Sequence, residues 1–569
     1  MERVLPGLWV LRTYQRRWLG RDVVAGLVLT ALLLPAGMGY AVAAGLPAIT
    51  GIYATIIPLV AYALFGPSRI LVLGPDSALV ALIAAAVVAR AARDPGHAIA
   101  LASILALLTG SLCVIGGLLR VGVVTNLLSK PVRVGYMHGI ALTILVTQLP
   151  KLLGFSVDAT SLHAGVLGLM EGIVDHKTNP VALAVGGGCL LVILALRAFA
   201  PRIPGVLIAV VAATLVVALG ELGDLVSVVG AVPSGVPLPA FPDVALAEIP
   251  PLIVAALGIA LVSFADTSVL SRTFAGRLGV RVDPDRELIA LGVANLATGF
   301  FQGFPISGSA SRTPVAEAAG AKSQVTNLVG ALALSLILLV PWLIRDLPTT
   351  ALAAIVISAA LSMVDIHELR VFYRVRRADF ILAVLAFVAV AVLGVIPGIP
   401  VAVGVSILDF VRRAWRPHDA ILGRAEGVKG YHDLKRYPAA RQVPGLVLFR
   451  WDAPLFFANA ETFRTRILDL AMQEPRPTWV IVTAEPITDI DTTAAEMLEE
   501  LDEELAVLGV VLAFAELKDP VKDRLRRYEL KTRLDGDRFF PTIGVAVKTF
   551  LATSKVEWVD WEDDSESHH

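Results

Sequence analysis

The sequence has little charge and little cysteine for its length. Only 17% of its 569 residues are charged, and 48 basic residues nearly balance 49 acidic ones, for a formal net charge of −1. A chain this close to neutral lacks the basic surface by which proteins bind nucleic acid. Its two cysteines, Cys113 and Cys189, lie in apolar runs, where packing is a more natural role than a disulfide or a metal site. We therefore expect no metal, no cofactor and no nucleic-acid partner.

Motifs of the common enzyme classes are also missing. No P-loop pattern precedes a hydroxyl residue, no His-Glu-x-x-His or zinc-ligand spacing occurs, and no nucleophile elbow stands out. We therefore predict that the protein is not an enzyme.

Apolar residues are what the chain has in excess. They make up 56% of the sequence, and the mean hydropathy is +0.74. They lie in repeated runs near the roughly 20 residues that an α-helix needs to cross a bilayer. We predict a polytopic α-helical membrane protein with about fourteen spans, seven in each half, the halves covering about 21–220 and 250–416. The first run continues past Tyr40 without a cleavage site, so we expect no cleavable signal peptide.

The arginines and lysines predict the orientation. If the count of spans holds, most of them fall on the side of the N-terminus, and the opposite loops hold only Arg90, Arg93, Lys151, Lys177 and Arg345. Loops rich in basic residues stay in the cytoplasm. We therefore predict an inner-membrane protein with a cytoplasmic N-terminal segment over 1–20 and a cytoplasmic C-terminus.

One polar run stands between two strongly apolar regions. Residues 303–315 read GFPISGSASRTPV. Within a membrane, backbone that is not helical must face protein or a water-filled cavity. The small residues over 307–310 predict an extended approach to a short helix, whose first free N–H groups, near residues 311–313, would attract an anion.

A second run of the same kind occurs in the first half. The residues Gly74-Pro75-Asp76-Ser77 follow a β-like stretch and open another apolar helix, roughly 230 residues before the first run, as paired interrupted segments of an inverted-repeat transporter should. We therefore predict that two half-helix ends meet at one site in the middle of the membrane.

Two carboxylates and one guanidinium belong to these apolar regions. Asp266 lies within a span, where an acid marks a functional site, and it could carry a proton. Asp76 stands at a helix start, where it either caps the helix or lines the site and must then be protonated to admit an anion. Arg312 is expected to contact the substrate, with a packing role or pairing with Asp266 as alternatives.

These runs, together with LLLPAGMGYAVAAGLPAITGIYATIIPLVAYALFGPSRILVLGP and DRELIALGVANLATGFFQGFPISGSASRTPVAEAAGA, resemble the sulfate permease (SulP) family of anion transporters over nearly the whole chain. The resemblance implies two inverted seven-span repeats, a core domain that moves against a gate domain, and an anion held between the third and tenth helices. It also suggests a homodimer. Ser311 and Arg312 match the family's anion-contacting Ser-Arg pair, Tyr40 its aromatic on the first span, and Asp266 its acid on the eighth.

The predicted site combines the residue analysis with this resemblance. Proton coupling is assigned to Asp266 or Asp76, and the predicted substrate-binding residues are Tyr40, Asp76, Ser77, Gly308, Ser309, Ala310, Ser311 and Arg312. Three positions depart from the family pattern. Ala36 replaces a glutamine found in many members, and Asp76 stands where many have an apolar residue. Leu270 replaces the hydroxyl that sodium-coupled members carry, which favours proton coupling.

The composition changes after Pro417. We predict a linker over 417–443, a soluble α/β unit over 444–558 that resembles a STAS domain, and an acidic disordered tail over 559–569. Its loop Asp491-Thr492-Thr493-Ala494 resembles the phosphorylated loop of related anti-sigma-factor antagonists. Because Ala494 replaces a glycine there, helix capping is the default role for Asp491 or Thr492, and phosphorylation of Thr493 is the alternative.

The sequence thus predicts a secondary active anion transporter in the lipid bilayer, with sulfate as substrate, proton symport as mechanism and alternating access of an elevator type. C4-dicarboxylate and bicarbonate are alternative substrates. An anion channel or a sensor with a signalling STAS domain is the alternative from another class.

Overall fold

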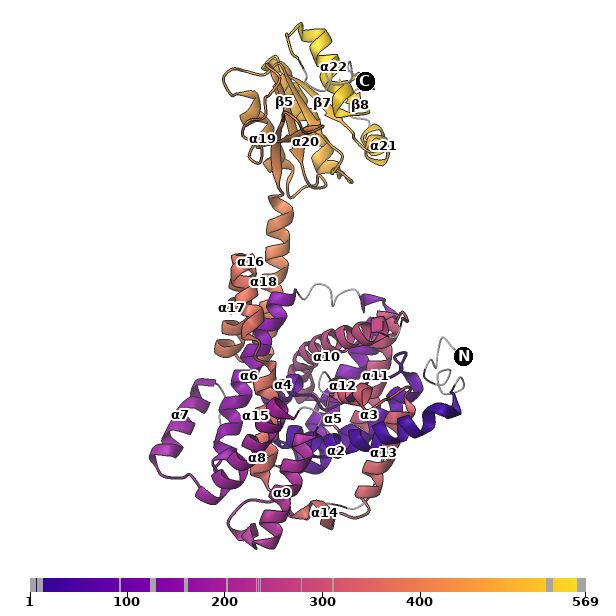
Figure 1. Cartoon of the computed structure of the whole chain (residues 1–569), viewed down its shortest axis with the longest axis vertical. Coiled ribbons are helices and arrows are strands. Elements are labelled where there is room, and N and C mark those ends of the chain that lie inside the picture. The colour runs from indigo at the N-terminus through magenta and orange to yellow at the C-terminus, as the bar shows by residue number, and fades with distance from the viewer. Residues whose placement is uncertain are drawn as a thin grey trace. The chain divides into compact units, whose positions relative to one another are not determined.

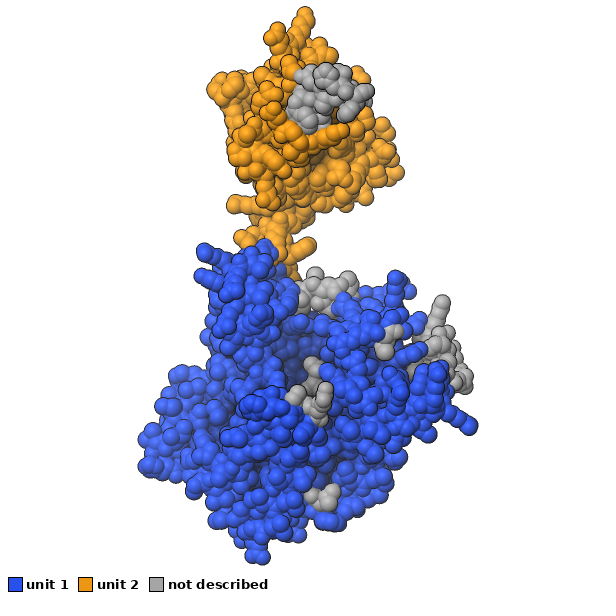
Figure 2. Space-filling view, viewed as in Figure 1, with its two compact units in different colours: residues 1–406 blue, residues 407–569 orange. Residues whose placement is uncertain are grey.

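The computed structural model describes residues 7, 14–91, 94–122, 129–157, 162–200, 203–231, 233, 235, 237–277, 279–309, 312–528 and 536–559. The chain forms two compact units, residues 1–406 and 407–569 (Figure 2). Eight helices within the described residues are long and apolar enough to cross a membrane.

The first unit is helical and runs through the same order of elements twice (Figure 1). Each half has two helices, a two-residue strand, a short helix and then further helices. The first half contains η1 (Arg16–Trp18), α2 (Leu19–Ala43), α3 (Ala48–Phe65), β1 (Leu73–Gly74), α4 (Ser77–Val87), α5 (Pro95–Leu118), α6 (Lys130–Leu152), α7 (Leu162–Val174), α8 (Pro180–Phe199), α9 (Gly205–Leu219) and η3 (Leu222–Asp224). The second half contains η4 (Leu246–Glu248), α10 (Ile249–Arg277), α11 (Pro284–Phe300), β2 (Ser307–Gly308), α12 (Arg312–Ala318), α13 (Val325–Ile337), α14 (Trp342–Arg345), α15 (Thr349–Met363), α16 (Ile366–Val375), α17 (Arg377–Leu393) and α18 (Val395–Trp415).

Helix contacts repeat between the halves with the partners exchanged. Helices α2 to α5 of the first half correspond in order to α10 to α13 of the second. Helix α4 packs on α10, and its equivalent α12 packs on α2. Likewise α5 packs on α11, and its equivalent α13 packs on α3. A second group of helices repeats in the same way, since α17 packs on α6 as α8 packs on α15. We call α2–α5 with α10–α13 the core group, and α6, α8, α9, α15 and α17 the gate group. The first unit is therefore a polytopic helical membrane domain built from two related halves.

Small residues let the core helices approach closely. A Cβ atom added to Gly110 of α5 would lie 2.7 Å from the carbonyl oxygen of Gly292 in α11, and one added to Gly292 would lie 2.7 Å from that of Gly110. Packing of this kind replaces the hydrophobic driving force that helices lack inside a bilayer. Any larger residue at either position would separate α5 from α11.

Two helices of the first unit were not predicted. Helix α7 lies in a stretch with no run long enough for a span, and α16 is a ten-residue amphipathic helix between two apolar helices. A search for apolar runs passes over both, because neither is continuously apolar over a membrane-spanning length.

The second unit is a mixed sheet covered by helices. Its strand order is β4-β3-β5-β6-β7-β8, with β5 to β8 parallel and β3 and β4 antiparallel. Phe449, Phe463 and Phe514 are fully buried on one face and Ile481 and Phe550 on the other. The elements are β3 (Asp419–Arg424), β4 (Tyr431–Asp433), β5 (Leu446–Trp451), α19 (Ala460–Ala471), β6 (Trp479–Thr483), α20 (Thr492–Val507), β7 (Val511–Ala515), α21 (Asp519–Arg527), η5 (Gly536–Arg538), β8 (Phe539–Phe540) and α22 (Ile543–Ser554).

The sheet begins earlier than expected. Strands β3 and β4 lie within 417–443, so the prediction that this whole segment is a linker was wrong. Ala420 and Leu422 of β3 are buried, and Ile421 and Leu422 pair with Phe449 and Leu448 of β5. The strand was missed because its few apolar residues stand among charged ones, and only pairing with β5 gives them a buried face.

Candidate anion-binding site

The two interrupted segments meet as a short antiparallel pair. Leu73 lies opposite Gly308 and Gly74 opposite Ser307. The pair continues through Ser309, whose N–H donates to the Val72 carbonyl at 3.0 Å. Helix α4 starts three residues after β1, and α12 starts four residues after β2. The predicted meeting of two half-helix ends is therefore confirmed.

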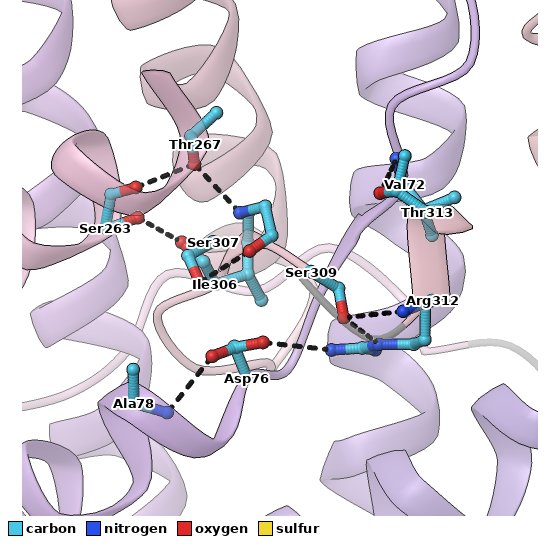
Figure 3. Close-up of polar contacts among 11 residues, drawn as sticks. Val72, Asp76, Ala78, Ser263, Thr267, Ile306, Ser307, Ser309, Arg312 and Thr313 are labelled. Atoms are coloured by element: carbon cyan, nitrogen blue, oxygen red, sulfur yellow. Dashed lines mark hydrogen bonds and ion pairs between the residues drawn. The ribbon is translucent and has the colours of Figure 1, made fainter. Parts of the chain in front are cut away.

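Side chains from α10 and α11 satisfy the backbone that enters β2. The Gly308 N–H donates to Thr267 Oγ1 at 2.8 Å, and the Ser263 hydroxyl donates to the Ile306 carbonyl at 2.7 Å (Figure 3). Asn295 binds both backbone groups of Ile306, at 2.9 and 3.2 Å. These contacts supply the partners that a non-helical segment needs at membrane depth.

Residues of the second half satisfy the backbone that enters β1. The Val72 N–H donates to Thr313 Oγ1 at 3.2 Å. The Gln324 amide donates to the carbonyls of Ser68 and Leu71 at 2.8 and 3.1 Å, and Asn327 donates to that of Leu71 at 2.9 Å. Side chains of the second half thus hold both interrupted segments.

Arg312 occupies the centre of the pair. Its side chain is 1% exposed, and its Nε donates to Ser309 Oγ at 2.8 Å. Its Nη2 lies 3.8 Å from Asp76 Oδ2, while neither Nη1 nor Nη2 has a hydrogen-bond partner within the described residues (Figure 3). A Cβ atom at Gly74 would lie 3.0 Å from Nη1, so glycine leaves room for the guanidinium. The outer edge of the guanidinium is therefore charged and buried, and it has no hydrogen bond to any residue that the structure describes.

Asp76 both caps a helix and faces Arg312. Its Oδ1 accepts the Ala78 N–H at 3.0 Å, which makes it the N-cap of α4, while Oδ2 points at Arg312. Its side chain is 14% exposed. Asp76 therefore caps α4 and contacts Arg312 at the same time, because its two oxygens serve different partners. A role of Asp76 in substrate binding stays a prediction. The alternative in which Arg312 pairs with Asp266 is not what the structure has: the ion pair is with Asp76.

Tyr40, Ser77 and Asp266 surround this pair. The Arg312 guanidinium lies 5.9 Å from the centre of the Tyr40 ring, within reach of a cation–π contact. Ser77 is the first residue of α4 and interacts with Tyr40. Asp266 is half-buried in α10 and interacts electrostatically with Asp76 and with Arg133 of α6.

The structure thus brings together Tyr40, Asp76, Ser77, Ser309 and Arg312, with Gly308 in β2 and Asp266 on the neighbouring helix. Ala310 and Ser311, the other two predicted binding residues, lie outside the described residues. Among the residues that the structure describes, no group of three or more histidine, cysteine, aspartate or glutamate residues is arranged to hold a metal ion.

Several polar residues at the site escaped the sequence analysis. Ser263, Thr267 and Asn295 are ordinary residues of apolar helices, and only a search for polar positions facing residues 303–309 would have singled them out. Tyr136 of α6 is fully buried, and its hydroxyl has no hydrogen-bond partner within the described ranges, although it lies close enough to Asp266 to interact with its charge. It brings the gate group to the edge of the site.

In the second unit Asp491 is a helix cap. Its Oδ1 accepts the Ala494 N–H at 2.9 Å and its Oδ2 the Phe457 N–H at 2.8 Å, so it caps α20 and ties the loop between β5 and α19 to the start of α20. Thr493 is exposed. Phosphorylation of Thr493 remains a prediction.

Comparison with known proteins decides the family. The family model described as "Sulfate permease family" matches residues 19–386, and that of the STAS domain matches residues 437–546. The chain belongs to the sulfate permease family. It is therefore an anion transporter of that family with a C-terminal STAS domain, as the sequence resemblance implied.

Named relatives agree with this assignment. A protein named "Probable sulfate transporter" from Mycobacterium tuberculosis is 42% identical over 549 residues, which cover 96% of this chain and 98% of the relative. "Sulfate transporter 4.1, chloroplastic" from Arabidopsis thaliana is 30% identical over 579 residues, 97% of this chain and 83% of the relative.

A solved structure gives the same fold for this sulfate permease family member. The murine Slc26a9 anion transporter matches with a TM-score of 0.88 at 23% identity, over 96% of this chain and 94% of the other. The likeness covers the membrane unit and the STAS domain, and at this identity it concerns the fold alone.

Proposed function

We propose that the protein takes up sulfate together with protons. The observation that carries this proposal is the buried Arg312 guanidinium, whose Nη1 and Nη2 atoms have no hydrogen-bond partner among the described residues and whose Nη2 lies 3.8 Å from Asp76 Oδ2. A planar fork of this kind matches the oxygens of an oxyanion. The relatives named sulfate transporters support sulfate as the oxyanion.

Asp76 supplies the link to protons in this proposal. Its carboxylate occupies the side of Arg312 that an anion would approach, so substrate and ionised Asp76 compete for the same positive charge. Protonation of Asp76 removes both this competition and the repulsion between two anions. Asp266 interacts with the charge of Asp76 and is the second candidate for the transported proton.

We propose alternating access because the candidate site residues all belong to one group of helices. Tyr40, Asp76, Ser309 and Arg312 all belong to the core group, and the gate group approaches them through α6 and α15. A core group that moves as a body carries the bound anion past the gate group without dismantling the site, which is the elevator form of transport.

Uptake by proteoliposomes tests the coupling. Purified protein is reconstituted, and accumulation of radiolabelled sulfate is followed with the external medium more acidic than the lumen, at equal pH, and with the gradient reversed. We expect accumulation above equilibrium only in the first condition. Uptake that ignores the gradient would remove proton coupling, and saturable accumulation against a gradient would exclude an open channel.

A competition panel tests the substrate. Unlabelled sulfate, C4-dicarboxylates and bicarbonate are added separately against labelled sulfate in the same liposomes. We expect unlabelled sulfate to compete best. Failure to take up sulfate, with uptake of a labelled dicarboxylate or bicarbonate, would transfer the proposal to that substrate.

Cytoplasmic termini and a homodimer complete the proposal. The arginines of the loops on the side of the N-terminus favour cytoplasmic termini. Cysteine labelling from outside intact cells at residues 97 and 429 tests it: only the first position should react. The mass of the protein in detergent, measured by light scattering, tests the homodimer: we expect twice the 60.2 kDa mass of one chain.

A further inference from the structure

Helix α16 is a surface element with two different sides. It follows α15 and precedes α17 in the chain, and it lies beside α17 (Figure 1). It is capped at its start by Asp365, whose Oδ1 accepts the Glu368 N–H at 3.0 Å. Phe372 is its only buried residue. A ten-residue helix cannot cross a membrane.

Contacts with α6 fix which side of α16 faces the protein. Lys130 Nζ lies 2.6 Å from Glu368 Oε2 and 5.9 Å from the centre of the Phe372 ring. The Asp365 N–H donates to His138 Nε2 at 3.1 Å. Glu368 and Phe372 therefore point inward. On the opposite side, Ile366 and Arg370 are exposed, and the Tyr373 ring packs edge-on against the Phe380 ring of α17, with 5.3 Å between the ring centres.

The outward side combines apolar and basic residues. Ile366 is 56% and Tyr373 55% exposed, and with Arg370 they follow the i, i+4, i+7 spacing of one helix side. Arg370, Arg374 and Arg377 are exposed, and none of the three has an acidic partner within the described residues. The Arg377 guanidinium lies 5.9 Å from the Tyr373 ring centre.

We propose that this side of α16, formed by Ile366, Arg370, Tyr373 and Arg374 together with Arg377 at the start of α17, binds anionic phospholipid headgroups of the cytoplasmic leaflet. A short amphipathic helix with arginines beside exposed apolar residues lies in the plane of a membrane interface, where its apolar residues enter the acyl boundary. The arginines then meet headgroup phosphates, and each contributes to the attraction for an anionic surface.

Lipid bound at α16 would act on the transport site through α15. Helix α15 precedes α16 directly and packs on α2, where a Cβ atom at Gly39 would lie 3.3 Å from the Leu352 carbonyl oxygen. Gly39 adjoins Tyr40. Headgroups that hold α16 at the interface therefore hold the C-terminal end of α15, a gate helix whose first turn touches the core beside the site. This consequence rests on the proposed transport function and orientation, whereas lipid binding itself does not rest on transport.

The binding test uses the full chain in neutral detergent. Its thermal unfolding midpoint is followed while phosphatidylglycerol, phosphatidylcholine or soluble glycerol 3-phosphate is added. We expect saturable stabilisation by phosphatidylglycerol alone, because soluble phosphate cannot use the apolar residues. Equal stabilisation by phosphatidylcholine or by glycerol 3-phosphate in the natural protein would overturn the proposal, whatever the variants do.

A triple variant, R370Q/R374Q/R377Q, assigns the site. Its apparent affinity for phosphatidylglycerol should fall roughly fivefold for each arginine removed. The matched control, R436Q/R476Q/R527Q, removes three exposed arginines of the second unit and should leave that affinity unchanged. An unchanged affinity in the first variant, or an equal fall in both, would contradict the assignment.

A transport arm separates this inference from the proposed function. Sulfate uptake is compared in liposomes of phosphatidylcholine with and without phosphatidylglycerol. We expect several-fold faster uptake with the anionic lipid in the natural protein and in the control variant, but not in R370Q/R374Q/R377Q. Uptake independent of lipid would overturn the regulatory step alone, and absence of sulfate uptake in every lipid would count against the proposed function while the binding result stands.

Discussion

The two interrupted segments are alike in backbone and opposite in charge. In both segments a two-residue strand is followed by a helix. In both, a threonine hydroxyl accepts a backbone N–H: Thr267 accepts from Gly308 of β2, and Thr313 accepts from Val72, the residue before β1. The first segment ends on Asp76, whose carboxylate caps its own helix. The second carries Arg312, whose terminal nitrogen atoms have no hydrogen-bond partner among the residues described.

This difference assigns separate tasks to the two segments. A helix start already capped by a carboxylate offers an anion nothing, whereas a buried guanidinium without a full set of acceptors attracts one. In the proposed mechanism, Asp76 is an internal anion that balances the Arg312 charge until substrate binds. Substitution of either charged residue tests this difference most directly, and substitution of the hydroxyl residues tests the smaller contributions to it.

Removal of the positive charge has the largest expected effect. Arg312→Ala leaves Asp76 buried without its counter-charge, which costs about 3–5 kcal/mol when a buried pair is broken. Sulfate uptake in proteoliposomes should fall by two orders of magnitude or more. Arg312→Lys keeps the charge but loses the fork, so it should retain measurable uptake with a raised KM. Equal activity of the natural protein and Arg312→Ala would refute the role of Arg312.

Neutralisation of Asp76 has the next largest effect. Asp76→Asn keeps an oxygen to cap α4 but cannot compete for Arg312 or carry a proton. Uptake by the natural protein should increase as the external pH is lowered, because protonated Asp76 admits the anion. The variant should lose most of this dependence and should no longer accumulate sulfate with a pH gradient. Asp266→Asn is the companion variant, and if it alone removes the dependence, the proton belongs to Asp266.

Ser309→Ala is expected to act more mildly. The change removes the hydroxyl that accepts from Arg312 Nε at 2.8 Å and leaves the charge in place. A hydrogen bond to a charged group contributes about 1.5–3 kcal/mol, so KM should increase roughly tenfold or more with little change in kcat. A fall in kcat at unchanged KM would show that Ser309 acts on the movement rather than on binding.

The two threonines should give the smallest effects. Thr267→Val and Thr313→Val each leave one buried N–H without its acceptor, which destabilises by about 1–3 kcal/mol. Thermal unfolding in detergent should show the larger fall for Thr267→Val, since its hydrogen bond is 2.8 Å against 3.2 Å for Thr313. A larger fall for Thr313→Val would mean that the hydrogen bond next to β1 contributes more to stability than the hydrogen bond to β2.

The sequence alone determined the class of protein and the elements of its site. Apolar runs of spanning length were sufficient for the membrane fold, and the motifs that resemble the family were sufficient to identify it, because hydrophobic length and helix-start chemistry are local properties. Two small-residue segments in corresponding places, with Tyr40, Asp76, Asp266 and Arg312, predicted a candidate site, whose role in binding stays a prediction. Tertiary structure decided which acid Arg312 faces, since residues 236 positions apart in the chain meet only through the β1–β2 pair. It also decided the role of polar residues such as Thr267 and Asn295, and the existence of β3 and α16. Their sequences specify little alone, because a hydroxyl, a short strand or a ten-residue helix gains its partner only from a distant part of the chain.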